Sequence, residues 1–328
     1  MHVNEVPTPA LVFDAEALER NLATMATALP GPRLRPHVKA HKCTSLAKRQ
    51  LAAGHVGFTC ATIRECEGMT VAGLGEDLLL ANEILEAARL GALVADGARV
   101  TVAVDSLETV EAASAGGVRE VLIDVNVGLR RCGCDVSDAG RLADICRDLG
   151  LSVRGVMGYE GHVVGLIDAA ERAALCEAAM ELLLKAHQDV GGELVSGGGT
   201  GTYQCNIWAN EIQAGSYALM DTAYMRLGLP FEQAVFVLAT VVSSSRDWSV
   251  ANAGLKAFGM DHGRPDLADA TVLSCSDEHS TFAPRRPVGD RVRLVPAHVD
   301  PTIAYHERAY LVSGDEVVDV WPIDLRGW

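Results

Sequence analysis

The sequence has little positive charge. It contains 28 Lys and Arg residues against 43 Asp and Glu residues, and its net charge is −15. A nucleic-acid partner requires a basic surface that neutralises phosphates, so this balance argues against such a partner. A local basic pocket for a single phosphate remains compatible with the composition.

Long hydrophobic runs, low-complexity segments and charge runs are also missing. No apolar stretch has the about 20 residues that a transmembrane helix needs, so we expect no membrane span. The start, MHVNEVPTPALVFD, is too short and too polar for a secretory signal, and we therefore expect a cytoplasmic location. Hydrophobic residues make up 49% of the chain and charged residues 22%, as in a soluble globular protein.

The nine cysteines show no spacing typical of a disulfide framework. Cys132 and Cys134 form an isolated C-x-C pair, which is weak evidence for a metal site. We interpret the cysteines as reduced and mostly buried small hydrophobic residues.

Short β-rich runs alternate with helical stretches in the first two thirds of the chain. Eight strand candidates begin with PHVKA (36–40) and end with IQAGSYALM (212–220), and helical patterns separate most of them. This rhythm predicts an α/β fold with a parallel (β/α)8 TIM-type barrel over residues 11–230, and an open doubly wound sheet is the alternative. After about Pro230, strand patterns follow one another directly. They predict a C-terminal antiparallel β domain over residues 231–328, paired with residues 1–10.

The stretch RLRPHVKAHKCTS places two histidines and two lysines in a run that otherwise reads as a buried strand. Side chains alternate along a strand, so His37, Lys39 and His41 would share one face and Lys39 would point into the barrel mouth. Burial disfavours a charged amine, and a neutral lysine suits a Schiff base with a carbonyl such as pyridoxal phosphate. A lysine paired with a carboxylate is the ordinary alternative, so the other motifs must decide.

Other polar motifs follow strand candidates, where barrel active sites lie. The glycines of SGGGTGT (196–202) would let backbone N–H groups approach a phosphate, and a plain turn is the alternative. Arg130 and Arg131 follow the fifth strand, and one of them would face a pyridine nitrogen unless they are only a surface pair. Tyr159 and His162 follow the sixth strand. His162 is a candidate acid–base group, and a structural histidine is the alternative.

The predicted β domain contains a candidate metal site. His298 and Asp300 would share one face of a strand and hold a divalent cation, with open positions for water or substrate. A hydrogen bond between the two is the ordinary alternative. Asp277, Glu278 and His279 form a second polar cluster, which would serve as an outer shell.

Eight motifs in order resemble one family over the span from near Pro7 to near Pro322. They are RPHVKAHK, TCAT, YEGH, SGGGTGTY, QAGSYALMD, GLKAFGMDHG, SDEHS and PAHVDPT. They resemble the metal-dependent D-threonine aldolase and D-serine dehydratase family, which comprises fold-type III pyridoxal 5′-phosphate enzymes related to alanine racemase. The chain departs from the family pattern at Asn126, His262 and Ser280.

The resemblance implies a role for most of the predicted site residues. Lys39 would form the Schiff base. Apart from the resemblance, we expect the general base to be His162 or a hydroxide bound to the metal. The resemblance implies that Arg131 would face the pyridine nitrogen. From its place after the sixth strand, we also expect Tyr159 to contact the cofactor. The phosphate would lie at Gly198, Gly199 and Thr200 near Tyr217, and the metal ligands would be His298 and Asp300.

The resemblance also implies a reaction class. We predict a lyase of D-amino acid metabolism that uses pyridoxal 5′-phosphate and a divalent metal to cleave D-threonine-like β-hydroxy amino acids to glycine and an aldehyde. Because Asp300 is a hard oxygen ligand, it favours Mn²⁺ or Mg²⁺ over Zn²⁺, which dehydratases of the family pair with cysteine. The alternatives are a D-serine or 3-hydroxyaspartate-type dehydratase, an amino-acid racemase, and a noncatalytic cofactor carrier, which would lack the β domain. A homodimer is expected from the resemblance alone.

Overall fold

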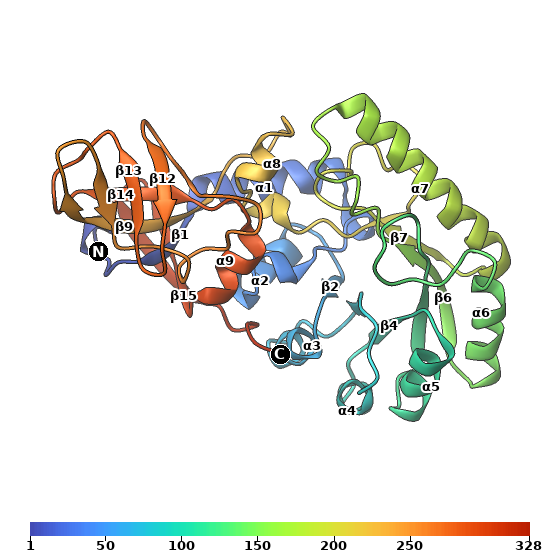
Figure 1. The fold of residues 1–328 in the computed structure, drawn as a ribbon. Coiled ribbons are helices and arrows are strands. Elements are labelled where there is room, and N and C mark those ends of the chain that lie inside the picture. The colour runs from blue at the N-terminus through green and yellow to red at the C-terminus, as the bar shows by residue number, and fades with distance from the viewer. The chain divides into compact units, whose positions relative to one another are not determined.

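The computed structural model describes residues 1–328, which divide into two compact units (Figure 1). The first unit consists of residues 1–25, 40–46 and 216–326. The second unit consists of residues 26–39, 47–215 and 327–328. The domain limits predicted from the sequence, 11–230 and 231–328 with 1–10, stay a prediction.

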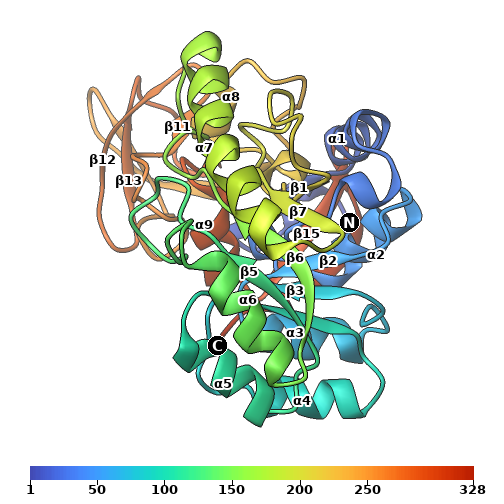
Figure 2. The same cartoon turned by 90° about the vertical axis from the view of Figure 1, so that its right-hand side faces the viewer.

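The second unit is built around a curled parallel sheet whose seven strands pair in chain order (Figure 2). The alternation of strands and helices in this unit agrees with the sequence pattern. The strands are β2 (Phe58–Cys60), β3 (Leu78–Leu80), β4 (Val100–Val104), β5 (Glu120–Asp124), β6 (Ser152–Gly158), β7 (Leu194–Gly197) and β8 (Glu211–Ile212). The helices are α2 (Thr44–Ala52), α3 (Ile63–Val71), α4 (Ala88–Ala95), α5 (Leu107–Ala115), α6 (Ala139–Asp148) and α7 (Ala169–Val190).

The barrel is only partly closed, which corrects the prediction of eight laddered strands. The predicted first strand forms no ladder. Leu34 pairs with Ile212 of β8, and His37 pairs with Thr59 of β2, each as an isolated parallel bridge. Pro36 lies between them and has no N–H to donate, which favours single bridges over a ladder.

Residues 38–40 form a 3-10 helix instead of continuing the predicted strand. Side chains therefore do not alternate here as they would in a strand, and the predicted common face of His37, Lys39 and His41 is wrong. The α/β class and the parallel sheet are confirmed. The closed eight-stranded geometry is not.

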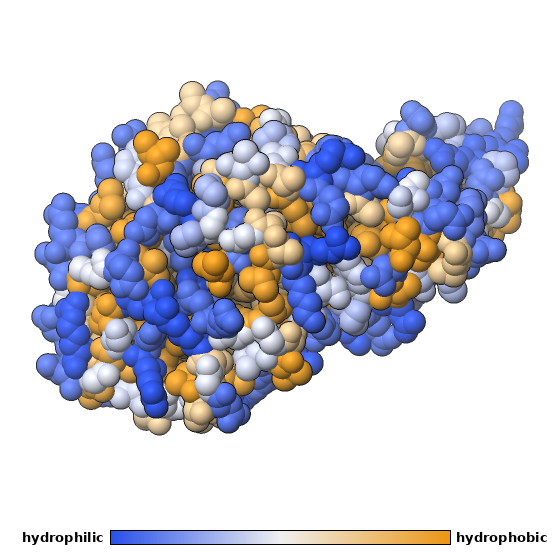
Figure 3. Space-filling view, turned by 180° about the vertical axis from the view of Figure 1, so that it is seen from behind, coloured by the Kyte–Doolittle hydropathy of each residue, from blue (hydrophilic) through white to orange (hydrophobic).

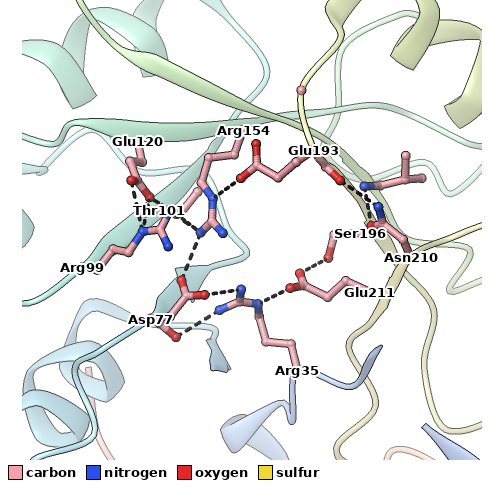
Figure 4. A network of polar contacts seen from close by, with 12 residues as sticks. Arg35, Asp77, Arg99, Thr101, Glu120, Arg154, Glu193, Ser196, Asn210 and Glu211 are labelled. Atoms are coloured by element: carbon pink, nitrogen blue, oxygen red, sulfur yellow. Dashed lines mark hydrogen bonds and ion pairs between the residues drawn. The ribbon is translucent and has the colours of Figure 1, made fainter. Parts of the chain in front are cut away.

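A network of buried charges lies near the amino-terminal ends of the parallel strands (Figure 4). Arg35 Nε donates to Glu211 Oε2 at 2.7 Å, and Arg35 Nη2 donates to Asp77 Oδ2 at 2.8 Å. Arg154 Nη1 donates to Asp77 Oδ1 at 3.0 Å, and Arg154 Nε donates to Glu193 Oε1 at 3.1 Å. Both arginines are buried and line a cavity of about 240 Å³. The two guanidinium groups thus bind together strand ends that are distant in sequence.

This network predicts how stability depends on sequence and pH. We expect Arg154→Met to lower the free energy of unfolding by about 3 kcal/mol, the low end for a broken buried pair, because Arg35 still binds Asp77. Burial by itself would raise the pKa of Asp77, but the hydrogen bonds and charges of Arg35 and Arg154 hold that pKa below its ordinary value of 3.8. The network therefore stabilises the fold above this pH and loses its effect as the pH falls through the lowered pKa.

Urea unfolding of the wild type and the variant as a function of pH measures both effects. Arg141→Met is the matched control, since Arg141 pairs with Asp138 on the surface and should cost less than about 1 kcal/mol. Equal losses in the two variants, or a loss in Arg154→Met that persists unchanged at acidic pH, would contradict the account.

The first unit is built around a nine-stranded, mostly antiparallel sheet. The strand order is β12-β13-β10-β9-β1-β15-β16, with β14 paired to β9 and β11 paired to β14. β1 pairs antiparallel with β9 and parallel with β15, so the N-terminal strand joins the C-terminal strands, as the sequence suggested. The strands are β1 (Ala10–Asp14), β9 (Val235–Ser244), β10 (Ser249–Ala251), β11 (Asp266–Leu267), β12 (Thr271–Cys275), β13 (Ser280–Ala283), β14 (Arg291–Val295), β15 (Arg308–Ser313) and β16 (Glu316–Pro322).

Helices also contribute to the first unit. α1 (Ala15–Ala28) begins after Asp14, whose Oδ1 accepts the N–H of Ala17 at 2.8 Å, the hydrogen bond typical of an N-cap residue. α8 (Thr222–Met225) and α9 (Val299–Tyr305) are short. The sequence pattern predicted only strands after Pro230, so α9 is a correction.

The longest helix, α7, has 22 residues and carries charged side chains along its length. No helix combines the length and the apolar character that a membrane span requires. On the face drawn in Figure 3, hydrophilic and hydrophobic residues are interspersed.

Candidate functional site

Lys39 lies just after the segment that bridges β8 and β2. Its side chain is half-buried. The bridges of Leu34 and His37 run parallel to the sheet, so Lys39 follows the carboxyl end of this segment. Tyr159 follows β6 and Gly198 follows β7 at the same edge. Residues that follow parallel strands gather at one edge of the sheet, so the fold assembles three predicted site elements there.

The loop after β7 is held in a conformation that requires glycine. Gly198 has φ +76°, and a Cβ atom at this position would lie 2.9 Å from Ile212 Cδ1. A Cβ atom at Gly201 would lie only 1.9 Å from the carbonyl oxygen of Val164. Larger residues would therefore clash with neighbours or strain the backbone. The motif is thus a tightly packed loop, and its role as a phosphate cradle stays a prediction.

A buried carboxylate, Glu160, supports this loop from inside the protein. Its Oε2 accepts the backbone N–H of Gly198 at 3.1 Å. Its Oε1 accepts the Thr202 hydroxyl at 2.7 Å and the Asn206 side-chain amide at 3.1 Å. The sequence interpretation missed Glu160, although a charged residue between Tyr159 and His162 at the end of an apolar strand was the available signal.

We expect Glu160→Gln to weaken pyridoxal phosphate binding about 10- to 100-fold. The amide would remove a charge that accepts four hydrogen bonds, one of them from the Cys176 thiol, and hydrogen bonds to charged groups contribute about 1.5–3 kcal/mol each. Titration of the cofactor-free protein with pyridoxal phosphate, followed by fluorescence, measures the effect. Glu177→Gln changes an exposed residue of α7 and is the control. If both variants bind the cofactor equally well, Glu160 does not support the cradle.

Tyr159 connects the cradle to Arg131. The Arg131 Cζ atom lies 5.5 Å from the centroid of the Tyr159 ring. A Cβ atom built on Gly199 would lie 3.5 Å from Tyr159 Cε2 and 3.8 Å from its hydroxyl oxygen. These are ordinary contact distances, so Gly199 lies directly beside the tyrosine ring. An amine, a glycine cradle, an aromatic ring and an arginine are groups that fit pyridoxal phosphate.

His162 is exposed and packs over the loop that follows β5. A Cβ atom at Gly128 would lie 2.9 Å from His162 Cε1. This loop also carries Arg131, so the structure brings His162 to the loop of the predicted cofactor arginine. Its role as the base stays a prediction.

Two carboxyl groups near Arg131 were also missed. Asp124 is the last residue of β5 and is buried. Burial raises the pKa of Asp124 well above its ordinary value, and the neighbouring Glu83 raises it further, while Arg131 opposes the shift. A narrow cavity is lined by Asp124, Arg131, Tyr159 and Cys132 among others. Asp124 therefore retains a proton more readily than an isolated carboxyl group does.

The predicted metal ligands lie in the first unit, at the start of α9. His298 is the N-cap residue and Asp300 lies in the first turn, so the prediction that both stand on a strand is wrong. Pro301 follows directly, and proline is tolerated in a first helical turn. His298 Nε2 and Asp300 Oδ2 are nevertheless 3.8 Å apart. This separation fits two ligands that each lie about 2.0–2.2 Å from one divalent cation.

Asp221 fixes the start of α9. It is buried, and its Oδ2 accepts the N–H of Val299 at 2.9 Å. Burial raises the pKa of Asp221. Tyr217 is fully buried in the same unit, with its ring centroid 5.7 Å from that of Phe231. The role of Tyr217 at the phosphate stays a prediction.

The cluster of Asp277, Glu278 and His279 forms the turn between β12 and β13. Glu278 pairs with Lys256 at 2.5 Å. The backbone oxygen of Asp277 accepts the N–H of the same lysine at 3.1 Å. These contacts fix the turn, and an outer-shell role for the cluster stays a prediction.

Family comparisons agree with this arrangement of a lysine and a glycine loop on a parallel sheet, together with an antiparallel β unit. The model of the alanine racemase N-terminal domain matches residues 13–223. A model of a serine dehydratase domain matches residues 234–312. The chain belongs to the alanine racemase-like, fold-type III family of pyridoxal phosphate enzymes.

Within that family, the chain is similar to aldolases over its whole length. It is 35% identical to a D-threonine aldolase of Arthrobacter sp, over 98% of this chain and 93% of the relative. It is 33% identical to a 3-hydroxy-D-aspartate aldolase of Paracoccus denitrificans (strain Pd 1222), over 100% of this chain and 94% of the relative. The crystal structure of a D-threonine aldolase from Filomicrobium marinum matches with a TM-score of 0.93 and 35% identity, covering 99% of this chain and 97% of that chain.

The chain is also similar to a dehydratase. It is 29% identical to the D-threo-3-hydroxyaspartate dehydratase of Delftia sp. (strain HT23), over 98% of both chains. A metal-free structure of that dehydratase with a cysteine replaced by alanine matches with a TM-score of 0.92 and 25% identity, covering 100% of both chains. A further variant replaces a histidine two positions earlier. His298 and Asp300 have the same spacing.

Proposed function

We propose that this protein is a pyridoxal phosphate- and divalent metal-dependent lyase that cleaves D-threonine-like β-hydroxy amino acids to glycine and an aldehyde. The observation that carries the proposal is the nitrogen–oxygen pair of His298 and Asp300, 3.8 Å apart, in a chain similar throughout to aldolases. An aspartate oxygen is a harder ligand than the cysteine that the sequence analysis associates with dehydratases.

The residues of the second unit would bind the cofactor. Lys39 would attach it covalently, and the loop of Gly198, Gly199 and Thr200 would donate to its phosphate. Arg131 would face the pyridine nitrogen, and a guanidinium group is a poor proton donor, so this residue would not supply a proton to that nitrogen. Tyr159 would pack beside the ring. Tyr217, a residue of the first unit, is assigned to the phosphate by resemblance alone. When bound, pyridoxal phosphate supplies an electron sink for the bond that breaks at Cα.

The residues of the first unit would hold the metal. His298 and Asp300 leave other positions around the ion open, as catalytic sites require. When bound, a divalent cation polarises the substrate's β-hydroxyl oxygen and lowers the pKa of that hydroxyl. Mn²⁺ or Mg²⁺ suits the oxygen ligand, and Zn²⁺ accepts the same pair. His162 would take the hydroxyl proton as the general base.

Product analysis tests the reaction class. We expect the holoenzyme to convert D-threonine into glycine and acetaldehyde, with L-threonine as the stereochemical control. Ammonia and a 2-oxo acid from D-threonine or D-serine would contradict the aldolase and establish the dehydratase alternative. Interconversion of enantiomers without cleavage would establish a racemase.

The resemblance also supports a homodimer. Light scattering coupled to size-exclusion chromatography tests the dimer directly. A mass of one chain, 34.7 kDa, would contradict it.

A further inference from the structure

We propose that Asp261 and His262 together orient the His298 ring as a metal ligand, Asp261 at the edge of the ring and His262 on its face. The inference rests on the proposed function, because that function makes His298 a ligand. Asp261 and His262 would be positioning residues, since they act through His298. Neither was assigned a role by the sequence analysis, which noted His262 only as a departure from the family pattern.

The contact at the edge of the ring fixes which nitrogen is available. His298 Nδ1 lies 2.6 Å from Asp261 Oδ2. A carboxylate only accepts hydrogen bonds, so the proton of a neutral imidazole lies on Nδ1 and the lone pair lies on Nε2. Nε2 is also the nitrogen that lies 3.8 Å from Asp300 Oδ2. The hydrogen bond to Asp261 thus leaves the lone pair on Nε2, the atom that lies near the second proposed ligand, Asp300.

The contact on the face limits tilting of the ring. The rings of His262 and His298 are stacked with their centroids 3.9 Å apart and an angle of 7° between their planes. His262 Nε2 is also 3.8 Å from Asp261 Oδ2, so Asp261 lies beside both rings. His298 is therefore restrained in rotation by its hydrogen bond and in tilt by its stacked neighbour.

The stacking of the two rings also bears on whether His262 positions His298 or binds the metal itself. Ligand atoms of Asp261, His262 and His298 lie within 4.8 Å of one another, which would allow a three-ligand site. However, imidazole lone pairs lie in the ring plane, and two nearly parallel stacked rings do not direct them at one ion about 2.0–2.1 Å from each nitrogen. The observed arrangement therefore favours His298 with Asp300 as ligands and His262 as packing.

Metal affinity tests the inference without recourse to turnover. Chelator-stripped, cofactor-loaded protein is titrated with Mn²⁺, and the free ion is followed by electron paramagnetic resonance. We expect Asp261→Ala to weaken Mn²⁺ binding about 10- to 100-fold, as is typical when an outer partner of a histidine ligand is lost. We expect His262→Ala to weaken it less, and His262→Phe to restore near wild-type affinity, because phenylalanine keeps the stack but has no ligand atom.

Asp266→Ala, an exposed aspartate of the same unit, is the control and should bind as the wild type does. The inference is overturned if Asp261→Ala stays within twofold of the wild type, or if His262→Phe is as weak as His262→Ala. His298→Ala distinguishes a failure of the positioning role from a failure of the proposed metal site. If it loses the metal while Asp261→Ala does not, only the positioning role fails. If it binds Mn²⁺ as tightly as the wild type, the proposed metal site fails and the inference fails with it.

Discussion

The Lys39→Ala variant should lose turnover of D-threonine by about 10²-fold or more, because it removes the amine that attaches the cofactor. It should also lose the visible absorption band of a cofactor attached to a lysine. Both losses would follow from the absence of the Lys39 amine. This amine lies after the bridging segment, at the carboxyl edge of the parallel sheet. Absorption spectra and steady-state kinetics of the cofactor-saturated variant measure them together.

The matched control is Lys42→Gly. Lys42 lies in the same motif and has φ +46°, a backbone conformation that glycine adopts without strain. This variant should keep both the band and the activity. A Lys39→Ala variant that retains the band, or a Lys42→Gly variant that loses it, would transfer the attachment site away from Lys39.

Removal of the metal should abolish cleavage while leaving the cofactor in place. We expect a chelator to stop turnover and added Mn²⁺ to restore it. We also expect His298→Ala and Asp300→Ala to weaken Mn²⁺ binding, because each variant removes a metal ligand. The loss should exceed the factor of about 10 to 100 that is typical when an outer partner of a ligand is lost. Metal analysis, kinetics and the cofactor spectrum of the same samples measure these effects.

The two outcomes of metal removal distinguish reaction classes. Polarisation of the β-hydroxyl by a cation is needed for a lyase of this kind but not for a racemase. Unchanged turnover after complete chelation would therefore argue against the metal site and favour a racemase. A loss of the cofactor band together with the metal would instead show that the variants had lost the fold.

Much of the parallel sheet was predictable, because strands buried on both faces appear as continuous apolar runs. The runs in β3 and β4 are examples, and their burial patterns are uniform. The segment of residues 36–40 was not predictable in the same way. Its apparent alternation is overridden by Pro36 and by a 3-10 helix, so single bridges replace a ladder.

The candidate site was likewise predictable only in part. The sequence indicated the lysine, the glycine loop and the HVD motif, because each is a local pattern. The hydrogen-bond partners of Glu160 lie 16 to 46 residues further along the chain, and Asp261 is 37 residues from His298. Such pairs form only when the chain has folded, so the local sequence could mark Glu160 as a charged residue but could not indicate which groups it binds.

The central claim is that pyridoxal phosphate is attached to Lys39. Reduction of the holoenzyme with borohydride, followed by proteolysis and mass spectrometry, locates the attachment directly. The account predicts a phosphopyridoxyl group on Lys39 in the peptide that spans the HVKAHK motif. A label on Lys42 or on any other lysine, or no label after saturation with cofactor, would contradict it.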